Sequence, residues 1–240
     1  MRKKIYLSVI IPAYNEEKII ENSLSIILKF LDKRSFKWEI IVVDDGSSDK
    51  TKSLVKTFSK NNVRLVSLLS NKGKGAALRE GVKYANGEFV IYTDADLSVP
   101  IKYINTFLRF LESGFDVVIG SRRVKGSNIK IHQPIVREVM GRFYTFLTKV
   151  ITLNNISDFT CGFKGFRRSA SKKIFKNSKI DRWAYDSEIL FLAKKYNYTI
   201  SQVPVEWLNR EDSRVRLGLV VFESFKDLLS VRFNDILGKY

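Results

Sequence analysis

The sequence predicts an α/β fold in which a mostly parallel sheet is flanked by helices on both faces. Short runs of β-branched and aromatic residues alternate with segments whose apolar residues recur at helical spacing. The short runs are apolar almost throughout, which is typical of strands buried on both faces. Such strands, alternating with helices, pair in parallel because each helix carries the chain back across the sheet.

The elements of this pattern can be placed in order. The strands are expected at Ile5–Ile11, Glu39–Val43, Val63–Leu69, Glu88–Thr93 and Asp116–Ile119. The helices are expected between them, at Glu17–Leu31, Lys50–Ser59, Gly75–Ala85 and Pro100–Leu111. A strand at Cys161–Phe166 and a helix that begins behind Trp183 follow. No linker or internal repeat interrupts the 240 residues, so one domain spanning 1–240 is expected.

The charge balance favours a partner that carries phosphate. The chain has 42 Lys and Arg against 25 Asp and Glu, a net charge of +17. Such a charge attracts nucleic acid, anionic lipid surfaces or phosphorylated small molecules, although a solvated cationic surface explains it equally well. The sequence has no zinc-finger spacing, RNA-binding aromatic signature or basic leucine-zipper region. We therefore expect phosphate ligands and a membrane surface, and no nucleic acid.

The single cysteine and the single histidine exclude several chemistries. Cys161 cannot form an intramolecular disulfide, which suits a reducing compartment, and it makes no usual zinc site with His132. The basic N-terminus lacks the features of a signal peptide. No run approaches the ~20 apolar residues of a membrane-spanning helix. We expect the protein to lie on a membrane rather than to cross it.

Acidic residues stand at the ends of several predicted strands. Glu16 follows the first strand, Asp44 and Asp45 follow the second, and Asp94 and Asp96 follow the fourth. The carboxyl ends of parallel strands meet at one edge of a sheet, where α/β proteins bind their ligands. Carboxylates gathered there repel one another unless a cation is bound, so a divalent metal is expected in this crevice.

The triplet Asp94-Ala95-Asp96 is the expected centre of that metal site. An extended backbone would point both aspartates to the same side. Mg²⁺ and Mn²⁺ commonly combine one or two carboxylates with substrate phosphates. The alternative is structural, because acidic pairs often precede a helix. Ser98, just before Pro100, would then be the N-cap of the next helix.

A segment rich in glycine and lysine, Asn71–Gly75, opens a predicted helix. Its glycines would let backbone N–H groups approach a phosphate, and Lys72 and Lys74 would add charge. Neither the dinucleotide-binding nor the P-loop fingerprint is present. An ordinary turn with glycines in left-handed positions explains the segment equally well.

Taken in order, these motifs resemble those of the family 2 glycosyltransferases, which have the GT-A fold. The matching segments are Pro12–Glu16, Val42–Ser47, Asn71–Gly75, Asp94–Asp96, Gly120–Arg122, Asp158–Lys164 and Arg182–Glu188. The last two are most similar to the polyprenyl-phosphate branch, above all dolichyl-phosphate glucosyltransferases and next dolichyl-phosphate mannose synthases. The resemblance implies a nucleotide-sugar half at about 1–120, an acceptor half at about 121–216 and a C-terminal amphipathic helix at about 217–240.

The resemblance also implies a set of donor-binding residues. Those expected to bind the nucleotide-sugar are Pro12, Tyr14, Glu16, Val43, Asp44, Asp45, Lys74, Asp94, Ala95, Asp96, Trp183 and Asp186. Asp94 and Asp96 are the expected ligands of Mg²⁺ or Mn²⁺. UDP-glucose is the expected donor, with GDP-mannose as the alternative, because base and sugar choice can turn on a few contacts. Asp186 has a structural alternative as a carboxylate in the first turn of a helix.

The acceptor implied by the resemblance is dolichyl or polyprenyl phosphate, bound through Arg122, Arg137 and Arg210. A guanidinium binds phosphate oxygens in pairs. A lipid monophosphate is largely dianionic at neutral pH, so displacement with inversion needs no strong general base. The expected catalytic residues are Asp96, Arg122 and Asp158. Asp158 would orient a substrate or, alternatively, hold a turn before the next strand.

Amphipathic stretches in the second half suggest how the chain meets a lipid. Helical spacing joins Val136, Val139, Met140, Phe143, Leu147 and Val150, and likewise Val221, Phe222, Phe225, Leu228, Leu229, Phe233, Ile236 and Leu237. Ordinary core packing is the alternative to membrane contact. With a lipid acceptor we expect at least one stretch to touch the membrane, and a peripheral protein at its cytoplasmic face.

One alternative of a different class is a nucleotide- or nucleic-acid-binding protein without catalytic activity. Asp94 and Asp96 argue against it, because a protein that transfers nothing has no need to keep both carboxylates.

Overall fold

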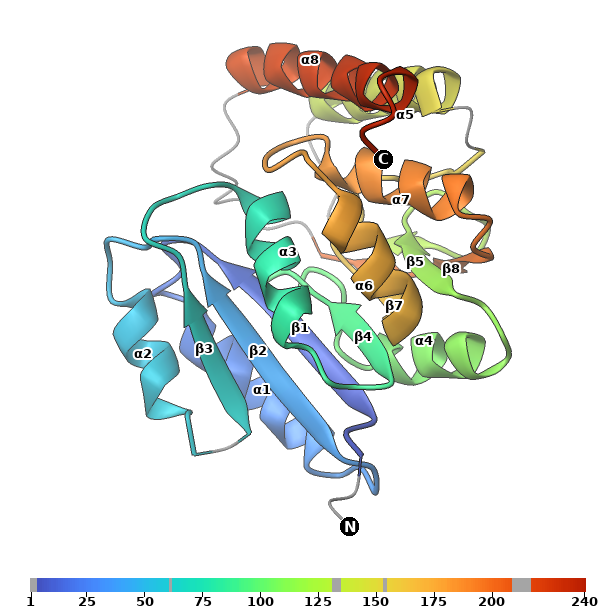
Figure 1. Ribbon diagram of the computed structural model, residues 1–240. Helices are drawn as coiled ribbons and strands as arrows, with labels where there is room; N and C mark the ends of the chain where they lie inside the picture. The colour runs from blue at the N-terminus through green and yellow to red at the C-terminus, as the bar shows by residue number, and fades with distance from the viewer. Residues whose placement is uncertain (1–3, 61, 131–134, 153–154, 209–216) are drawn as a thin grey trace.

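A seven-stranded sheet forms the centre of the molecule, with the strand order β3-β2-β1-β4-β7-β5-β8 (Figure 1). The computed structural model describes residues 4–60, 62–130, 135–152, 155–208 and 217–240. The strands are β1 Leu7–Ala13, β2 Trp38–Asp44, β3 Val63–Ser67, β4 Phe89–Tyr92, β5 Val117–Ser121, β7 Lys164–Arg167 and β8 Ile200–Pro204. A small second sheet pairs β6 (Asn128–Ile129) with β9 (Glu206–Trp207).

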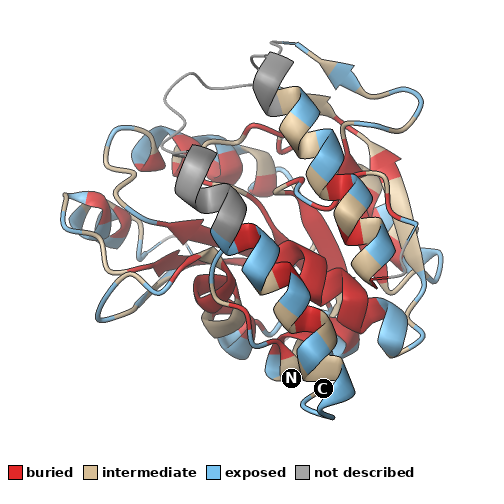
Figure 2. Cartoon of the chain, turned by 90° about the horizontal axis from the view of Figure 1, so that it is seen from above, coloured by how far each residue is buried: buried red, intermediate tan, exposed pale blue. Residues whose placement is uncertain are grey.

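Helices cover both faces of the sheet, which confirms the predicted α/β class. They are α1 Ile20–Leu31, α2 Thr51–Thr57, α3 Lys74–Tyr84, α4 Tyr103–Glu112, α5 Ile135–Thr152, α6 Arg168–Asn177, α7 Tyr185–Lys195 and α8 Leu217–Ile236. Buried side chains of α1, α2 and α4 share one apolar core, and those of α3, α6, α7 and α8 share the other. Helices α5 and α8 lie side by side in an outer layer against α7 (Figures 1 and 2).

Strand β1 runs to Ala13, past its predicted end at Ile11. Its register with β2 continues through Pro12↔Val43, whereas its register with β4 stops at Ile10↔Tyr92. Proline has no N–H to donate to a neighbouring strand. It is tolerated at position 12 because β4 no longer pairs there, and the strand carries Pro12 to the edge of the sheet.

Strand β7 is the antiparallel member of the mostly parallel sheet that the sequence predicts. It begins at Lys164 rather than at Cys161, and it runs antiparallel to β4 and β5 while the other pairs of the sheet are parallel. Its amino end therefore lies at the same edge as the carboxyl ends of β4 and β5. The segment 158–163 is thereby brought to the crevice that the acidic strand ends predict.

Candidate active site

The loops that follow β1 and β2 are hydrogen-bonded into one unit. The Asn15 N–H donates to Ser47 Oγ at 2.9 Å, and the Ser48 N–H donates to Asn15 Oδ1 at 2.9 Å. The Glu16 N–H donates to Thr51 Oγ1 at 2.7 Å. Asn15 adopts the left-handed region, with φ of 55°, which asparagine tolerates better than most residues. The adjoining Tyr14 side chain is exposed beside this junction.

The two aspartates that end β2 have different surroundings. The Asp45 carboxylate accepts the N–H groups of Lys72 and Gly73, each at 2.8 Å. Burial raises the pKa of Asp45, while these two N–H groups lower it. Asp44 accepts the Ser47 N–H at 3.2 Å. Asp45 is therefore committed to holding the loop before α3, which leaves Asp44 as the better candidate for a nucleotide contact.

At the amino end of α3 the Gly75 and Ala76 N–H groups are not open to a phosphate, which favours the alternative of an ordinary turn for the segment Asn71–Gly75. The Gly75 and Ala76 N–H groups both donate to the Asp181 carbonyl, at 2.7 and 3.2 Å. Gly73 has φ of 109°, a conformation that favours glycine. These amides are already paired, but the Lys74 side chain forms an ion pair with Asp94. Burial alone would lower the pKa of Lys74, but the charges of Asp94, Tyr185 and Asp186 and the hydrogen bond to Asp94 together raise that pKa.

The backbone at the Asp94 triplet forms a turn. The prediction that an extended backbone points Asp94 and Asp96 to the same side is therefore wrong. Strand β4 ends at Tyr92, and the Leu97 N–H donates to the Asp94 carbonyl at 3.2 Å. Asp96 accepts the Ser98 N–H at 2.9 Å and the Ser98 hydroxyl at 2.6 Å. Ser98 is not the N-cap of α4, which begins at Tyr103, because its hydroxyl is bound to Asp96.

Gly162 makes room for the Asp94 carboxylate. A Cβ atom at position 162 would lie 2.0 Å from Asp94 Oδ2, far inside van der Waals contact. The glycine comes from the segment before β7, which the antiparallel strand places beside β4. The side chain of Asp94 is thus fixed between Lys74 and the backbone at 162.

Replacing Gly162 by alanine should displace the Asp94 side chain without removing its charge. We expect catalytic turnover to fall by about 10²-fold, the usual effect of misplacing a reacting group by about 1 Å. Turnover and thermal melting of the purified variant would test this. Gly114→Ala is the control, because Gly114 has open space around its Cβ position, so that alanine there strains only the positive φ of the backbone and meets no neighbouring atom. Loss of activity equal to that of the control would contradict the prediction.

The residues at this edge fit a divalent cation that is shared with a substrate. Among the described residues, no group of three or more His, Cys, Asp or Glu side chains could hold a metal alone. Asp94 and Asp96 offer hard oxygen donors, and the ammonium of Lys74 already occupies Asp94 as a cation would. A site with so few protein ligands suits Mg²⁺ or Mn²⁺ completed by water and phosphate oxygens.

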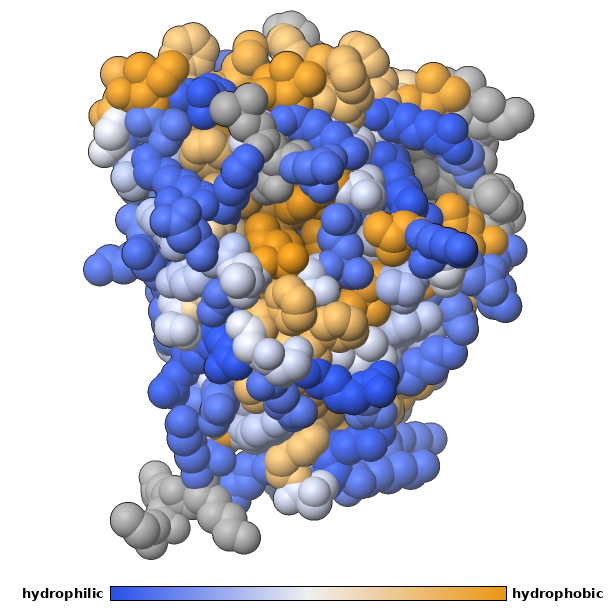
Figure 3. All heavy atoms as spheres, turned by 90° about the vertical axis from the view of Figure 1, so that its right-hand side faces the viewer, coloured by the Kyte–Doolittle hydropathy of each residue, from blue (hydrophilic) through white to orange (hydrophobic). Residues whose placement is uncertain are grey.

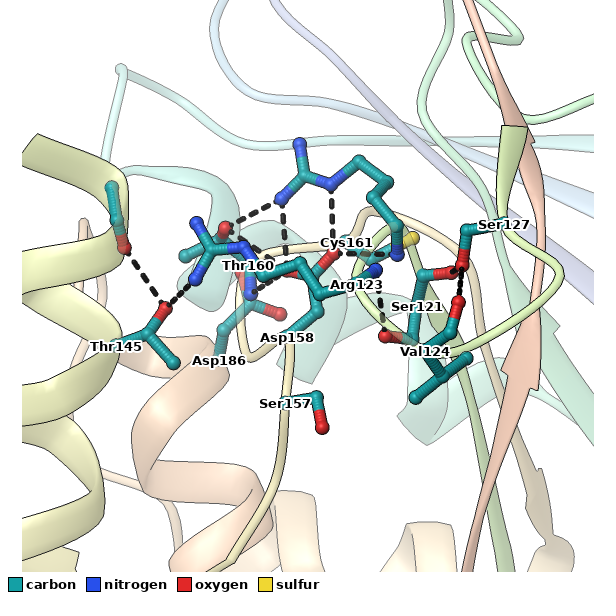
Figure 4. A network of polar contacts seen from close by, with 12 residues as sticks. Ser121, Arg123, Val124, Ser127, Thr145, Ser157, Asp158, Thr160, Cys161 and Asp186 are labelled. Atoms are coloured by element: carbon teal, nitrogen blue, oxygen red, sulfur yellow. Dashed lines mark hydrogen bonds and ion pairs between the residues drawn. The ribbon is translucent and has the colours of Figure 1, made fainter. Parts of the chain in front are cut away.

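Arg122 and Asp158 form a two-point ion pair beside β5. Arg122 Nε donates to Asp158 Oδ2 at 2.7 Å and Nη2 donates to Oδ1 at 2.8 Å. The Asp158 side chain is fully buried, which would raise its pKa, but the charge of Arg122 and the hydrogen bonds from Arg122 together hold that pKa well below the usual range. The Thr160 N–H also donates to Asp158, at 3.3 Å. The structural alternative for Asp158, holding a turn before the next strand, is therefore confirmed, and Figure 4 shows this carboxylate inside the loop network.

A buried polar cluster joins β4, β7 and α7. The Asp186 carboxylate accepts bonds from the Lys164 ammonium, at 2.5 Å, and the Tyr92 hydroxyl, at 2.9 Å. Lys164 is fully buried and also donates to the Cys161 carbonyl. Asp186 stands in the first turn of α7, but its side chain is engaged in the interior. Burial raises the pKa of the Cys161 thiol to about 11, so it is no nucleophile at neutral pH.

The remaining predicted residues are only partly placed. Trp183 is exposed just before α7. Arg210 lies outside the described residues, and so does the side chain of Arg137. The sequence-based prediction missed Gly162 and Arg123. Arg123 directly follows Arg122 at the end of a predicted strand, and this position could have drawn attention to it. The phosphate-binding role at that strand end was predicted for Arg122 alone.

A hollow of about 680 Å³ lies at the opposite ends of the strands, beside Trp38 and Val63. None of the predicted site residues lines it. The carboxyl edge of the sheet is the better candidate because the hydrogen-bonded and ion-paired acidic groups Asp44, Asp94, Asp96 and Asp158 converge there.

The comparisons with known proteins are consistent with this geometry. Residues 8–175 match the family model described as glycosyl transferase family 2. The chain is 34% identical to a dolichyl-phosphate beta-glucosyltransferase of Dictyostelium discoideum, over 98% of this chain and 76% of that protein. The human protein of the same description is 31% identical, over 98% of this chain and 77% of its own length.

A solved structure has a similar fold. It is the glucosyl-3-phosphoglycerate synthase of Mycobacterium tuberculosis in complex with Mn²⁺, UDP-glucose and phosphoglyceric acid. The TM-score is 0.67 at 21% identity, covering 95% of this chain and 79% of that chain. Likeness at this identity concerns the fold.

Proposed function

The chain belongs to glycosyl transferase family 2 and has its GT-A fold, and on that premise we propose that it transfers glucose from UDP-glucose to dolichyl or polyprenyl phosphate. The observation that carries this proposal is the similarity, over nearly the full chain, to dolichyl-phosphate beta-glucosyltransferases. We place the reaction at the cytoplasmic face of a membrane, where the free thiol of Cys161 stays reduced.

The donor is proposed to bind across the carboxyl ends of β1, β2 and β4. Pro12, Tyr14, Glu16, Val43, Asp44, Lys74, Ala95 and Trp183 are the proposed contacts, and Asp45 supports them through the loop before α3. Asp94 and Asp96 would hold a Mg²⁺ or Mn²⁺ ion. When bound, the cation would offset the charge of the departing diphosphate.

In the proposed reaction the protein positions the two substrates and does not need to supply a general base. The acceptor phosphate has a second pKa of about 6, so it is ionised near neutral pH and can attack the anomeric carbon directly, with inversion. Asp158 is buried and paired with Arg122, and its low pKa keeps it ionised. We assign Asp158 the role of positioning the Arg122 guanidinium.

A transfer assay tests the proposed function. The purified chain would be incubated with labelled UDP-glucose, UDP-N-acetylglucosamine or GDP-mannose, with a polyprenyl phosphate in vesicles and with Mg²⁺ or Mn²⁺. Glucose transfer that outpaces the other donors supports the proposal. Preference for GDP-mannose would establish the mannose alternative, and no transfer to lipid phosphate from any donor would refute both.

Two neighbouring helices present an apolar face that suits a membrane surface. The exposed side chains are Val139, Phe143, Phe146 and Val150 on α5, and Phe225, Leu229, Phe233 and Ile236 on α8. Leu228 and Val231 of α8 face the core instead. Hydrophobic residues gather along this edge of the molecule in Figure 3. In the described part of the chain, no helix is long and apolar enough to span a membrane. We propose that this face rests on the membrane, with the basic charge of the chain drawing it to anionic lipid.

Replacing Phe143 and Phe233 together by serine should weaken binding to anionic vesicles by at least about tenfold, because each phenylalanine loses the free energy of apolar burial. Vesicle sedimentation measures the effect. Ile26→Ser on α1 is the control, since Ile26 is also a large exposed apolar residue but lies on the other face of the sheet. Equal loss in the control, or none in the double variant, would contradict the proposed face.

A further inference from the structure

Arg123 stands between the end of β5 and helix α5. Its backbone N–H donates to Ser121 Oγ at 3.2 Å, and its guanidinium Nη1 donates to the hydroxyl of Thr145 on α5. The Thr145 hydroxyl in turn donates a hydrogen bond to the Gly141 carbonyl at 2.9 Å. Figure 4 shows the Arg123 side chain extending from its backbone beside Ser121 toward Thr145.

The charge of Arg123 is not neutralised within the described structure. No carboxylate lies within ion-pair distance of Arg123 among the described residues, whereas the neighbouring Arg122 is paired with Asp158. Burial lowers the pKa of Arg123, and repulsion from Arg122 and Arg142 adds to it, against the attraction of Asp158 and Glu138. A guanidinium with a neutral hydroxyl partner and cationic neighbours is an anion-binding arrangement.

Helix α5 passes close to this guanidinium at Gly141. A Cβ atom at Gly141 would lie 3.1 Å from Arg123 Nη2, closer than ordinary contact. Glycine inside a helix is destabilising relative to alanine, so its presence there favours a local reason such as this close approach. Helical spacing places Arg142 between the Gly141 and Thr145 side of α5 and the exposed apolar row that contains Phe143. The cations therefore border the face proposed to meet lipid.

We propose that Arg123 and Arg142 bind the phosphate monoester of the lipid acceptor where α5 meets the membrane, with the Thr145 hydroxyl holding the Arg123 guanidinium in place. This inference rests on the proposed function and adds residues to it: the guanidinium of Arg122 is held by Asp158, and Arg123 is the neighbour that can grip a new anion. A dianionic monoester matches the paired cations, and the apolar row of α5 faces the acyl or prenyl chain behind it.

The kinetic test uses Arg123→Gln in the full chain. We expect the KM for polyprenyl phosphate to rise by about tenfold or more, with the KM for the nucleotide-sugar unchanged. Thr145→Val should give a smaller rise in the same constant. Lys125→Gln is the control, because it removes one exposed cation from the same loop. An unchanged acceptor KM in Arg123→Gln, or an equal rise in the control, overturns the inference.

A binding test without donor separates this inference from the proposed function. Neutral phosphatidylcholine vesicles would carry either a polyprenyl phosphate, a monoester, or phosphatidylglycerol, a diester. Arg123→Gln should lose the preference for the monoester vesicles; equal weakening on both kinds would reduce the site to general charge and overturn the proposal. Displacement of the wild type by equimolar glycerol 3-phosphate would show that the site takes a soluble phosphate, which also overturns it. If the wild type transfers no sugar but prefers monoester vesicles through Arg123, the proposed function falls and this site stands.

Discussion

Replacing Asp94 by asparagine should lower the turnover of sugar transfer by about 10²–10³-fold, the range seen when one preorganised electrostatic contact to a transition state is removed. Asparagine keeps the shape of the side chain, so the close fit against Gly162 is preserved. It removes the charge that pairs with Lys74 and that would hold a divalent cation. The pair is partly exposed, so the melting temperature should change little.

One measurement, the binding of Mn²⁺, separates this expectation from a general loss of structure. Mn²⁺ binding, followed by the paramagnetic signal of the free ion in the presence of UDP, should weaken in Asp94→Asn and in Asp96→Asn. Asp32→Asn, an exposed aspartate at the end of α1, is the matched control and should behave as the wild type does. Full turnover in both active-site variants would show that the metal assignment is wrong.

The position of Asp94 illustrates how far local pattern predicts this site. Apolar runs predicted β1, β2 and β4, and parallel pairing placed Asp44 and Asp94 at one edge, as observed. The direction of the side chains was not predictable in the same way. The turn closed by the Leu97 N–H and the contact with Gly162 depend on residues that local spacing does not bring together.

The pairings across the crevice depend on β7. Its antiparallel insertion between β4 and β5 brings Asp158 to Arg122 and Gly162 to Asp94. A short strand carries little sign of its direction in its composition, because direction is set by packing against distant elements. The sequence motifs predicted that Arg122 and Asp158 lie near the reaction. They did not predict that the two side chains form an ion pair, because that pair depends on the direction of β7.

Replacing Asp158 by asparagine should destabilise the fold by about 3–5 kcal/mol, the usual loss when one partner of a buried ion pair is removed. Asp158 is fully buried and Arg122 nearly so, and the variant would leave the guanidinium without its counter-charge over the Trp207 ring. The melting temperature should fall by on the order of 10 °C for a chain of this size. Thermal melting at neutral pH measures the effect.

The pH dependence of the same variant provides an internal check on the cause. The pKa of Asp158 is depressed in the folded protein because the charge of Arg122 and its hydrogen bonds together outweigh burial, so the contribution of Asp158 to stability is complete above its unfolded pKa of about 3.9. The contribution is lost as the pH falls below that value toward the folded pKa. The difference in melting temperature between wild type and Asp158→Asn should therefore be constant near neutral pH and shrink below about pH 4.

A double variant, Arg122→Met with Asp158→Leu, should recover much of the stability without restoring transfer, because apolar side chains can replace the pair in packing but not in positioning phosphate. Recovery of transfer in that double variant would show that Arg122 and Asp158 serve the fold alone.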